Sequence, residues 1–174
     1  MNRYLFFFII VLFIGCDKTE DNIFTQTPDE RLKATADEYR EALFSAPNGW
    51  FLAVDTKKDG AYRLWMSFEE NERVGMLSDM DATFSKAGET SVVPCISSWR
   101  LKALLAPSLI FDTYSYLHIL ADPQGANNGG SNSEGLISDF EFRIVDTDNG
   151  GINLIGNYNG RLARMDRATP EEAE

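Results

Sequence analysis

The pattern of apolar and polar positions divides this chain into three parts. Residues 4–14 are an unbroken apolar run. Further on, Leu32, Ala36 and Leu43 recur at helical spacing, which predicts one buried stripe on an amphipathic helix. From residue 50 onward the apolar positions alternate with a period of two in short segments, which is typical of β-strands. The pattern therefore predicts an N-terminal helix followed by sequential strands.

The predicted helix has clear ends. Thr27 is a suitable N-cap, Pro28 suits the first helical position, and Glu30 stands at the capping-box position. The segment Pro47-Asn48-Gly49 then stops the helical pattern. We therefore expect a helix over about residues 28–46.

Turn signals separate the predicted strands. Asp59-Gly60, Asn149-Gly150 and Asn159-Gly160 are dipeptides that favour tight hairpins. Residues 122–135 are rich in Gly, Asn and Ser and contain no apolar anchor, which predicts a long mobile loop. The strands are expected near residues 50–55, 62–68, 73–78, 91–97, 99–105, 108–112, 139–144, 152–155 and 161–166.

We expect one α+β domain, in which the N-terminal helix packs on an antiparallel β-meander. About eight short strands would form a curled sheet or a partly open barrel to hide their edges. A chain of 174 residues is long enough to bury a core without disulfides or metals. The expected organisation is a signal peptide at residues 1–15, a flexible acidic tether at 16–23, the α+β domain at 24–168 and a frayed tail at 169–174.

Cys16 decides how the apolar run is interpreted. The run follows Arg3 and ends before Gly15, and it is shorter than the roughly 20 apolar residues that span a bilayer. A cysteine directly after a small residue is typical of a lipoprotein signal, in which Cys16 receives lipid and becomes the mature N-terminus. An ordinary cleaved signal and a short membrane anchor are the alternatives. The prediction is attachment to a membrane through lipid on Cys16.

The charge of the chain argues against one class of partner. The formal net charge is −11 at pH 7, from 16 Lys and Arg against 27 Asp and Glu. Binding of nucleic acid needs clustered basic residues. Here they are scattered, apart from Arg161, Arg164 and Arg167 near the C-terminus. We therefore expect no nucleic-acid partner.

Residues suited to catalysis or metal binding are sparse. His118 is the only histidine, so a multi-histidine metal site is excluded and a serine triad would have to use it. Its apolar neighbours favour a packed or capping histidine. Cys95 also has apolar neighbours, which favour a small buried side chain over a nucleophile. No metal or other cofactor is expected.

Acidic and aromatic residues offer two further possibilities. Asp79 with Asp81, or Asp112 with Asp122, would support glycoside hydrolysis if each pair came to a defined separation. Trp65 lies on the strand face opposite the apolar stripe, where it would either stack on a sugar or pack in a second buried face.

Several segments together resemble a known family. They are Pro28-Asp29-Glu30-Arg31-Leu32, Ala46-Pro47-Asn48-Gly49-Trp50, Leu109-Ile110-Phe111-Asp112-Thr113-Tyr114, Leu117-His118 with Ala121-Asp122-Pro123, Asp139-Phe140-Glu141-Phe142, and Gly156-Asn157 to Arg164-Met165. In their order and spacing they resemble the Bacteroidetes lipoprotein family known as domain of unknown function 4302, over about residues 24–166. The acidic stretch after Cys16 also resembles the surface-export signal of Bacteroidetes lipoproteins.

The resemblance implies an exported, lipid-anchored protein of the outer membrane, and the export signal favours display at the cell surface over the periplasmic face. Such proteins are often encoded beside outer-membrane nutrient-uptake pairs of the kind used for glycans. The family implies no activity and no catalytic residues. Asp112, Tyr114, His118 and Asp122 lie in the most family-like segment, and with Trp65 they are the candidate ligand-binding residues.

These observations lead to one expectation and two alternatives. We expect a non-enzymatic accessory protein of an outer-membrane nutrient-uptake system. It would bind a glycan, a peptide or a partner protein such as the transporter or its surface receptor. The alternatives are a surface hydrolase that uses paired carboxylates and a structural subunit of an outer-membrane complex.

Overall fold

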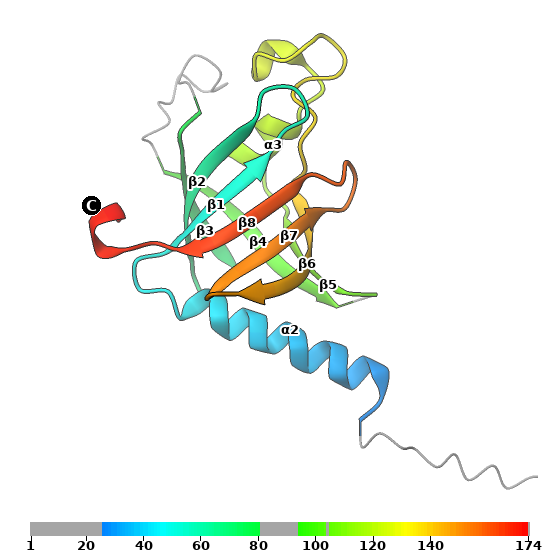
Figure 1. The fold of residues 1–174 in the computed structure, drawn as a ribbon, viewed down its shortest axis with the longest axis vertical. Coiled ribbons are helices and arrows are strands. Elements are labelled where there is room, and N and C mark those ends of the chain that lie inside the picture. Colours follow the sequence, from blue (N-terminus) through cyan, green and yellow to red (C-terminus); the bar gives the residue numbers. More distant parts are fainter. Residues whose placement is uncertain (1–25, 81–93, 104, 174) are drawn as a thin grey trace, which may run out of the picture.

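The strands of this chain close into a ring. The computed structural model describes residues 26–80, 94–103 and 105–173, and it is an antiparallel β-barrel of eight strands (Figure 1). Each strand pairs with the next along the chain, and β1 pairs with β8. The strands are β1 (Trp50–Asp55), β2 (Ala61–Phe68), β3 (Arg73–Ser78), β4 (Cys95–Ala103), β5 (Pro107–Phe111), β6 (Glu141–Asp148), β7 (Gly151–Gly156) and β8 (Leu162–Arg167).

The predicted fold class is wrong. The fold is mostly β rather than α+β, and the barrel is closed rather than a curled sheet or a partly open barrel. Closure comes from the pairing of Trp50–Val54 with Ala163–Arg167, which satisfies the backbone groups that two end strands would otherwise expose. Alternation along each strand shows which side chains point inward. It does not show that the first strand pairs with the last.

One predicted strand break is also wrong. β4 runs without interruption from Cys95 to Ala103, where the sequence pattern suggested two strands. The first half of β4 pairs with β3 and the second half pairs with β5, so the same strand serves two neighbours in turn. The change of partner near Ser98 leaves the backbone extended and needs no turn.

Side chains fill the interior of the barrel. An eight-stranded barrel is just wide enough for its interior to be packed with side chains. The inward positions of the strands carry large apolar residues, and segments outside the strands add two leucines. The largest of these buried side chains are Trp50, Trp99, Phe111, Phe142, Leu52, Leu64, Met66, Met76, Leu109, Leu117, Leu120 and Met165.

The predicted N-terminal helix is confirmed as α2 (Pro28–Phe44), which ends two residues before the predicted limit. Its capping box is complete: the Thr27 N–H donates to Glu30 Oε2 at 2.8 Å, and the Glu30 N–H donates to Thr27 Oγ1 at 3.2 Å. The helix runs across one end of the barrel, below the strands in Figure 1. There Leu43 is buried and its carbonyl oxygen accepts a hydrogen bond from Trp50 Nε1 at 3.0 Å.

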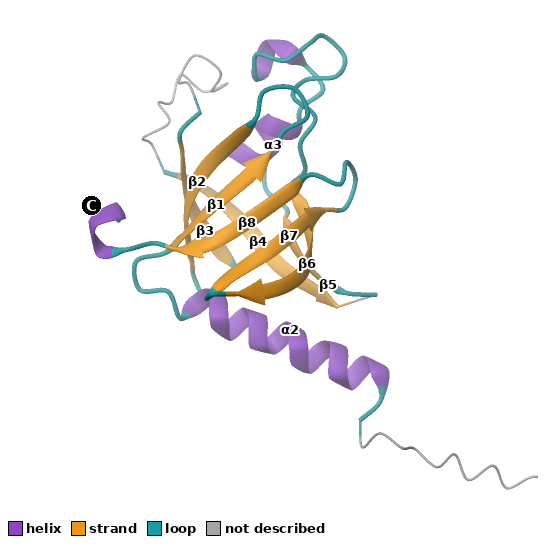
Figure 2. Ribbon diagram, viewed as in Figure 1, coloured by secondary structure: helices purple, strands orange, loops and turns teal. Residues whose placement is uncertain are grey.

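A second helix, α3 (Tyr116–Ala121), covers the opposite end of the barrel (Figure 2). Four of its six side chains are buried in the core, which explains the apolar character of this stretch. The sequence pattern did not predict it because six residues are too few to show helical periodicity. Among the described residues, no helix has the length and apolar character needed to cross a bilayer.

The sequence analysis found no apolar anchor in the loop after α3, but the structure shows that a buried polar side chain anchors it. Asn128 is 2% exposed, and its Nδ2 donates to the carbonyl oxygens of Ile119 (2.8 Å) and Asp122 (2.9 Å). The backbone of the loop is also closely packed: a Cβ added at Gly135 would lie only 1.9 Å from the backbone carbonyl oxygen of Asp122. It includes a short 3₁₀ helix, Gly125–Asn127. The anchor is a polar side chain, so a search for apolar residues misses it.

Several predictions fall on residues near the N-terminus, between β3 and β4, or near the C-terminus. The signal peptide (1–15), Cys16 with the acidic tether (16–23), and Asp81 lie outside the described residues. Within the predicted frayed tail, Pro170–Glu172 form a 3₁₀ turn with a capping box at Thr169.

Candidate functional site

Four aromatic side chains follow one another on the surface at the α3 end. We call Tyr114, His118, Phe140 and Tyr158 the aromatic row. Successive ring centroids lie 5.7, 4.3 and 6.3 Å apart, with planes inclined by only 30°, 23° and 31°. The two outer rings are the most exposed, at 49% for Tyr114 and 73% for Tyr158. A large exposed aromatic side chain is often part of a binding surface.

The antiparallel topology brings these four residues together from three places in the sequence. Tyr114 and His118 follow β5, Phe140 precedes β6, and Tyr158 follows β7. In an antiparallel barrel, the ends of β5 and β7 and the start of β6 lie at the same rim. That rim is opposite α2, since α2 leads into the start of β1 at the other rim.

Asp139 fixes the turn that carries Tyr158. Its side chain is 1% exposed, and its two oxygens accept the backbone N–H groups of Tyr158 (3.0 Å), Asn159 (2.8 Å) and Arg161 (3.1 Å). Such a buried carboxylate is tolerable only when hydrogen bonds replace the lost water. Asp139 and Phe140 are neighbours in sequence, so the same segment sets the turn and supplies a ring of the row.

His118 lies between Tyr114 and Phe140 in the row and is half-buried. Its ring stacks on Phe140 and lies beside Tyr114, while Nδ1 is 3.1 Å from Ser115 Oγ. Burial lowers the pKa of His118 below its ordinary 6.5, although nearby Asp112 and a hydrogen bond with the Phe111 backbone act in the opposite direction. Ser115 is 1% exposed, which places its hydroxyl out of reach of a substrate. The contact between Ser115 and His118 is therefore part of the packing of α3, and the Ser115 hydroxyl is not placed to act as a nucleophile.

Asp122 lies next to the row and accepts a hydrogen bond from Tyr114. The Tyr114 hydroxyl donates to Asp122 Oδ2 at 3.3 Å, and Asn127 Nδ2 donates to the same oxygen at 2.7 Å. Burial, with a smaller contribution from the Asp122 carboxylate, raises the pKa of Tyr114. Asp112 instead forms a 3.0 Å ion pair with Arg100. The two aspartates thus have separate partners, and the structure gives no support for a hydrolytic pair.

Trp65 does not belong to the row. Its Nε1 donates to the Asn48 carbonyl oxygen at 2.8 Å, and its ring lies so close to Gly49 that a Cβ there would be 2.9 Å away. Trp65 is half-buried, while Trp50 and Trp99 are each only 1% exposed. Trp50 and Trp99 therefore belong to the core, and Trp65 packs against Asn48 and Gly49.

The structure thus unites some of the predicted residues and adds two that the sequence analysis missed. Tyr114 and His118 are in the row, Asp122 touches it, and Asp112 acts on His118 only through its charge. Phe140 and Tyr158 were missed because Phe140 fits the alternation of a strand. An aromatic residue within the Asn157-Tyr158-Asn159-Gly160 turn is the signal that was available for Tyr158.

A comparison with protein families identifies the chain. A family model described as "Domain of unknown function (DUF4302)" matches residues 20–174. The chain belongs to the DUF4302 family. This confirms the resemblance to domain of unknown function 4302, and the DUF4302 match contains the whole barrel and all four residues of the aromatic row. No curated protein and no solved structure matches the chain.

The DUF4302 description names no activity, so the chemistry of the site has to be argued from its residues. In the part of the chain that the structure describes, no three His, Cys, Asp or Glu side chains gather as they would around a metal ion. The row offers ring faces and ring edges, and Asp122 and Asn127 offer hydrogen-bonding groups beside them. This combination suits a ligand with both apolar C–H faces and hydroxyl groups.

Proposed function

We propose that this protein is an exported, lipid-anchored accessory protein of an outer-membrane nutrient-uptake system, and that it binds a glycan without catalysis. The observation that carries the proposal is the aromatic row, flanked by a carboxylate and an amide on an exposed rim. A pyranose ring presents C–H groups on its faces and hydroxyls around its edge. Aromatic rings bind the C–H faces, and side chains such as Asp122 and Asn127 form hydrogen bonds with the hydroxyl groups.

The position of the row agrees with attachment through Cys16. The chain from Cys16 leads into α2, and α2 covers the barrel end opposite the row. A lipid on Cys16 would therefore leave the row pointing away from the anchored end, where a glycan in the surrounding medium reaches it. This arrangement supports a row that faces away from the membrane to which the lipid is attached.

Binding without catalysis is favoured by the state of the polar groups around the row. Asp112 pairs with Arg100, Asp122 accepts from Tyr114 and Asn127, and the Ser115 hydroxyl is buried. Glycoside hydrolysis needs two carboxyl groups that flank one bond. The side chains at the row are instead held by one another, as in a rigid binding surface.

The first experiment is a glycan screen with the segment 20–174, which contains the complete closed barrel and both covering helices. A bound glycan is then titrated by calorimetry against Tyr158→Ala. We expect this variant to weaken binding by about fivefold, because one aromatic contact is worth about 1 kcal/mol. Leu105→Ala, which removes an exposed apolar side chain between β4 and β5, outside both this row and the rim that carries it, is the matched control.

Two results would contradict the glycan proposal. One is a screen in which no glycan is retained above background. The other is a glycan whose affinity is the same for Tyr158→Ala and for the unchanged protein, which would place the binding surface elsewhere. Release of a reducing end during the titration would indicate the hydrolase alternative.

The anchor and the uptake system need a separate test in cells. Mass spectrometry of the N-terminal peptide should show lipid on Cys16, and Cys16→Ser should release the protein from the outer membrane. A pull-down of the native lipoprotein from outer membranes should recover a transporter or its surface receptor. A native protein that is membrane-bound but free of partners would contradict the accessory role.

A further inference from the structure

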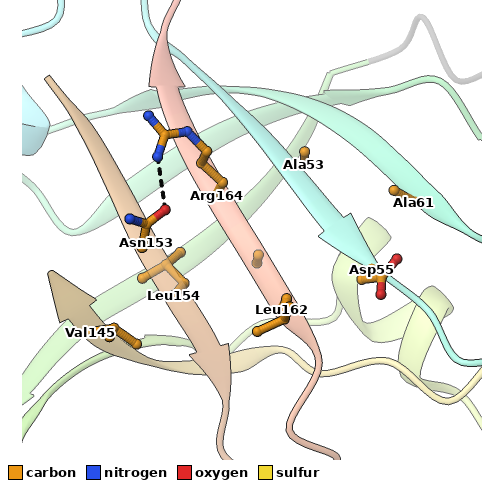
Figure 3. Close-up of a pocket in the computed structure, with 9 residues that line it drawn as sticks. Ala53, Asp55, Ala61, Val145, Asn153, Leu154, Leu162 and Arg164 are labelled. Atoms are coloured by element: carbon orange, nitrogen blue, oxygen red, sulfur yellow. Dashed lines mark hydrogen bonds between the residues drawn. The ribbon is translucent and has the colours of Figure 1, made fainter. Parts of the chain in front are cut away.

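A shallow apolar groove runs along the outer wall of the barrel, away from the aromatic row (Figure 3). We call it the outer groove. It has a volume of about 430 Å³ and lies over β1, β7 and β8, with contributions from β2 and β6. Its lining residues include Ala53, Asp55, Ala61, Val145, Leu162 and Arg164.

The hollow comes from small side chains next to large ones. Ala53 and Ala61 occupy positions where a longer side chain would fill the groove, while Leu162 (65% exposed) and Val145 (57% exposed) stand above the surface. Val145 lies at the register shift between Ile144 and Asp146, where the extra residue of a β-bulge changes the direction of its side chain. Solvent-facing strand positions are normally polar, so these exposed aliphatic residues are not explained by the fold.

The basic side chain of the groove is already neutralised. Arg164 Nε donates to both carboxylate oxygens of Asp166 at 2.9 and 3.0 Å, its NH1 donates to Asn153 Oδ1 at 2.8 Å, and it also pairs with Asp148. Two aspartates around one arginine leave this end of the groove with a net negative charge. An anionic ligand would therefore find no free cation here.

The other end of the groove carries a carboxylate that lacks a cation. Asp55 closes the groove where β1 ends (Figure 3), and within the described parts of the chain no Lys or Arg lies within ion-pair distance of it. The nearby Lys58 is paired with Glu134 at 2.9 Å. An apolar groove with negative charge at both ends is complementary to an aliphatic group that carries a positive charge.

We propose that the outer groove docks a basic, aliphatic segment of a partner polypeptide. An aliphatic side chain of the partner packs between Leu162 and Val145 over the two alanines, and a lysine or arginine of the partner pairs with Asp55. The net charge of −11 on the chain draws the same kind of partner toward this surface. The inference does not depend on glycan binding, because it uses a different wall of the barrel.

The test uses three short capped peptides of equal length and the ¹⁵N-labelled segment 20–174. One peptide alternates leucine and lysine, the second alternates leucine and glutamate, and the third alternates serine and lysine. We expect the first to shift the backbone amides of Ala53, Asp55 and Leu162 on titration. The other two should bind about tenfold more weakly or worse, because each lacks one of the two matching features.

Two conservative variants connect the binding to the named residues. Asp55→Asn should reduce the preference for lysine over glutamate, and Leu162→Ser should weaken the leucine–lysine peptide by about tenfold. Tyr158→Ala should change neither result, which separates this surface from the aromatic row. Both variants alter exposed or half-exposed positions, and their amide spectra show directly whether the barrel is intact.

Three outcomes would overturn the proposal. Equal binding of the three peptides would mean non-specific adsorption, and shifts confined to residues outside the outer groove would place the contact elsewhere. The third is hexylammonium binding at the groove as tightly as the leucine–lysine peptide. That result would make the occupant a small amine and not a polypeptide.

Discussion

Both ends of the barrel are covered by a helix with buried apolar side chains, but the α3 end adds a loop that is held by buried polar side chains. At the lower end in Figure 1, α2 has a complete capping box and buries Ala36 and Leu43 against the barrel. At the upper end, α3 is followed by a loop whose position depends on buried polar groups. The Asn128 amide bonds the carbonyl oxygens of Ile119 and Asp122, and the Asp139 carboxylate bonds three N–H groups.

The difference has consequences for both stability and function. Apolar burial is non-directional, so the α2 end tolerates exchanges among apolar residues of similar volume. Buried hydrogen bonds are directional, and removing one partner leaves the other without water or protein to bind. The aromatic row lies at the α3 end, where Asp139 and Asn128 fix the backbone. A surface held in this way presents its side chains in a defined geometry before any ligand arrives.

The largest expected effect comes from Asp139→Ala. The change leaves the N–H groups of Tyr158, Asn159 and Arg161 without an acceptor, and each such group costs about 1–3 kcal/mol. We expect the free energy of unfolding to fall by about 3 kcal/mol or more, as measured by urea denaturation. Asp112→Ala, at a half-exposed ion pair, should cost less than about 1 kcal/mol. Equal losses would mean that the α3 end does not depend on its buried carboxylate.

Two glycines with positive φ sharpen the comparison. Gly135 and Gly60 have φ values of +61° and +73°, so alanine is strained by about 1–2 kcal/mol at either position. At Gly60 an added Cβ meets nothing within 4 Å, whereas at Gly135 it would lie 1.9 Å from the Asp122 oxygen. Gly135→Ala should therefore destabilise the protein by about 1–3 kcal/mol more than Gly60→Ala in urea denaturation. Similar losses in the free energy of unfolding at both sites would show that the loop after α3 shifts to accommodate the added methyl group.

A smaller effect is expected at the α2 end from Thr27→Ala. This change removes the Oγ1 acceptor for the Glu30 N–H and should cost about 1 kcal/mol. The loss should be local, with faster amide exchange in the first turn of α2 and unchanged exchange in β6 and β7. Thr35→Ala is the control, because the Thr35 hydroxyl only bonds the Arg31 carbonyl within the helix. Faster amide exchange throughout the barrel would contradict the expectation that the capping box stabilises only the first turn of α2.

The same contrast explains how much of the fold was predictable from the sequence. The capping box, the stripe of α2 and the inward positions of the strands are local or periodic patterns, and the structure confirms α2 and the hairpins. Barrel closure depends on pairing between β1 and β8, which are more than a hundred residues apart, and no local pattern encodes it. The continuity of β4 depends in the same way on the two strands that flank it.

The candidate site was harder to predict because its residues are polar or isolated in the sequence and form no periodic pattern. Tyr114 and His118 were found through the family-like segment, but Phe140 and Tyr158 join them only through the topology of β5, β6 and β7. Asp139 looks like an outward-facing strand residue in the sequence, and only the fold shows that it is buried. Trp65 was chosen for its outward position, and Asn48 and Gly49 occupy the space around its ring.

The smallest expected effect is a pH dependence from His118. Burial lowers its folded-state pKa below 6.5, so the unfolded chain binds the proton more readily than the folded protein does. By linkage, stability is then fully present above the unfolded pKa and is lost as the pH falls from about 6.5 toward the lowered folded value.

His118→Gln removes this titration and is compared with the unchanged protein by urea denaturation at about pH 7.5 and about pH 5.5. Carboxylates contribute to both proteins alike, so the difference between their losses on acidification isolates the histidine. We expect the unchanged protein to lose more stability than His118→Gln over this interval. A larger loss in His118→Gln would mean that Asp112 and the Phe111 backbone outweigh burial and that the aromatic row is stabilised by a charged imidazole. The same comparison with bound glycan would then show whether the ligand prefers the neutral ring, because a ligand that does so increases the pH dependence of its own affinity.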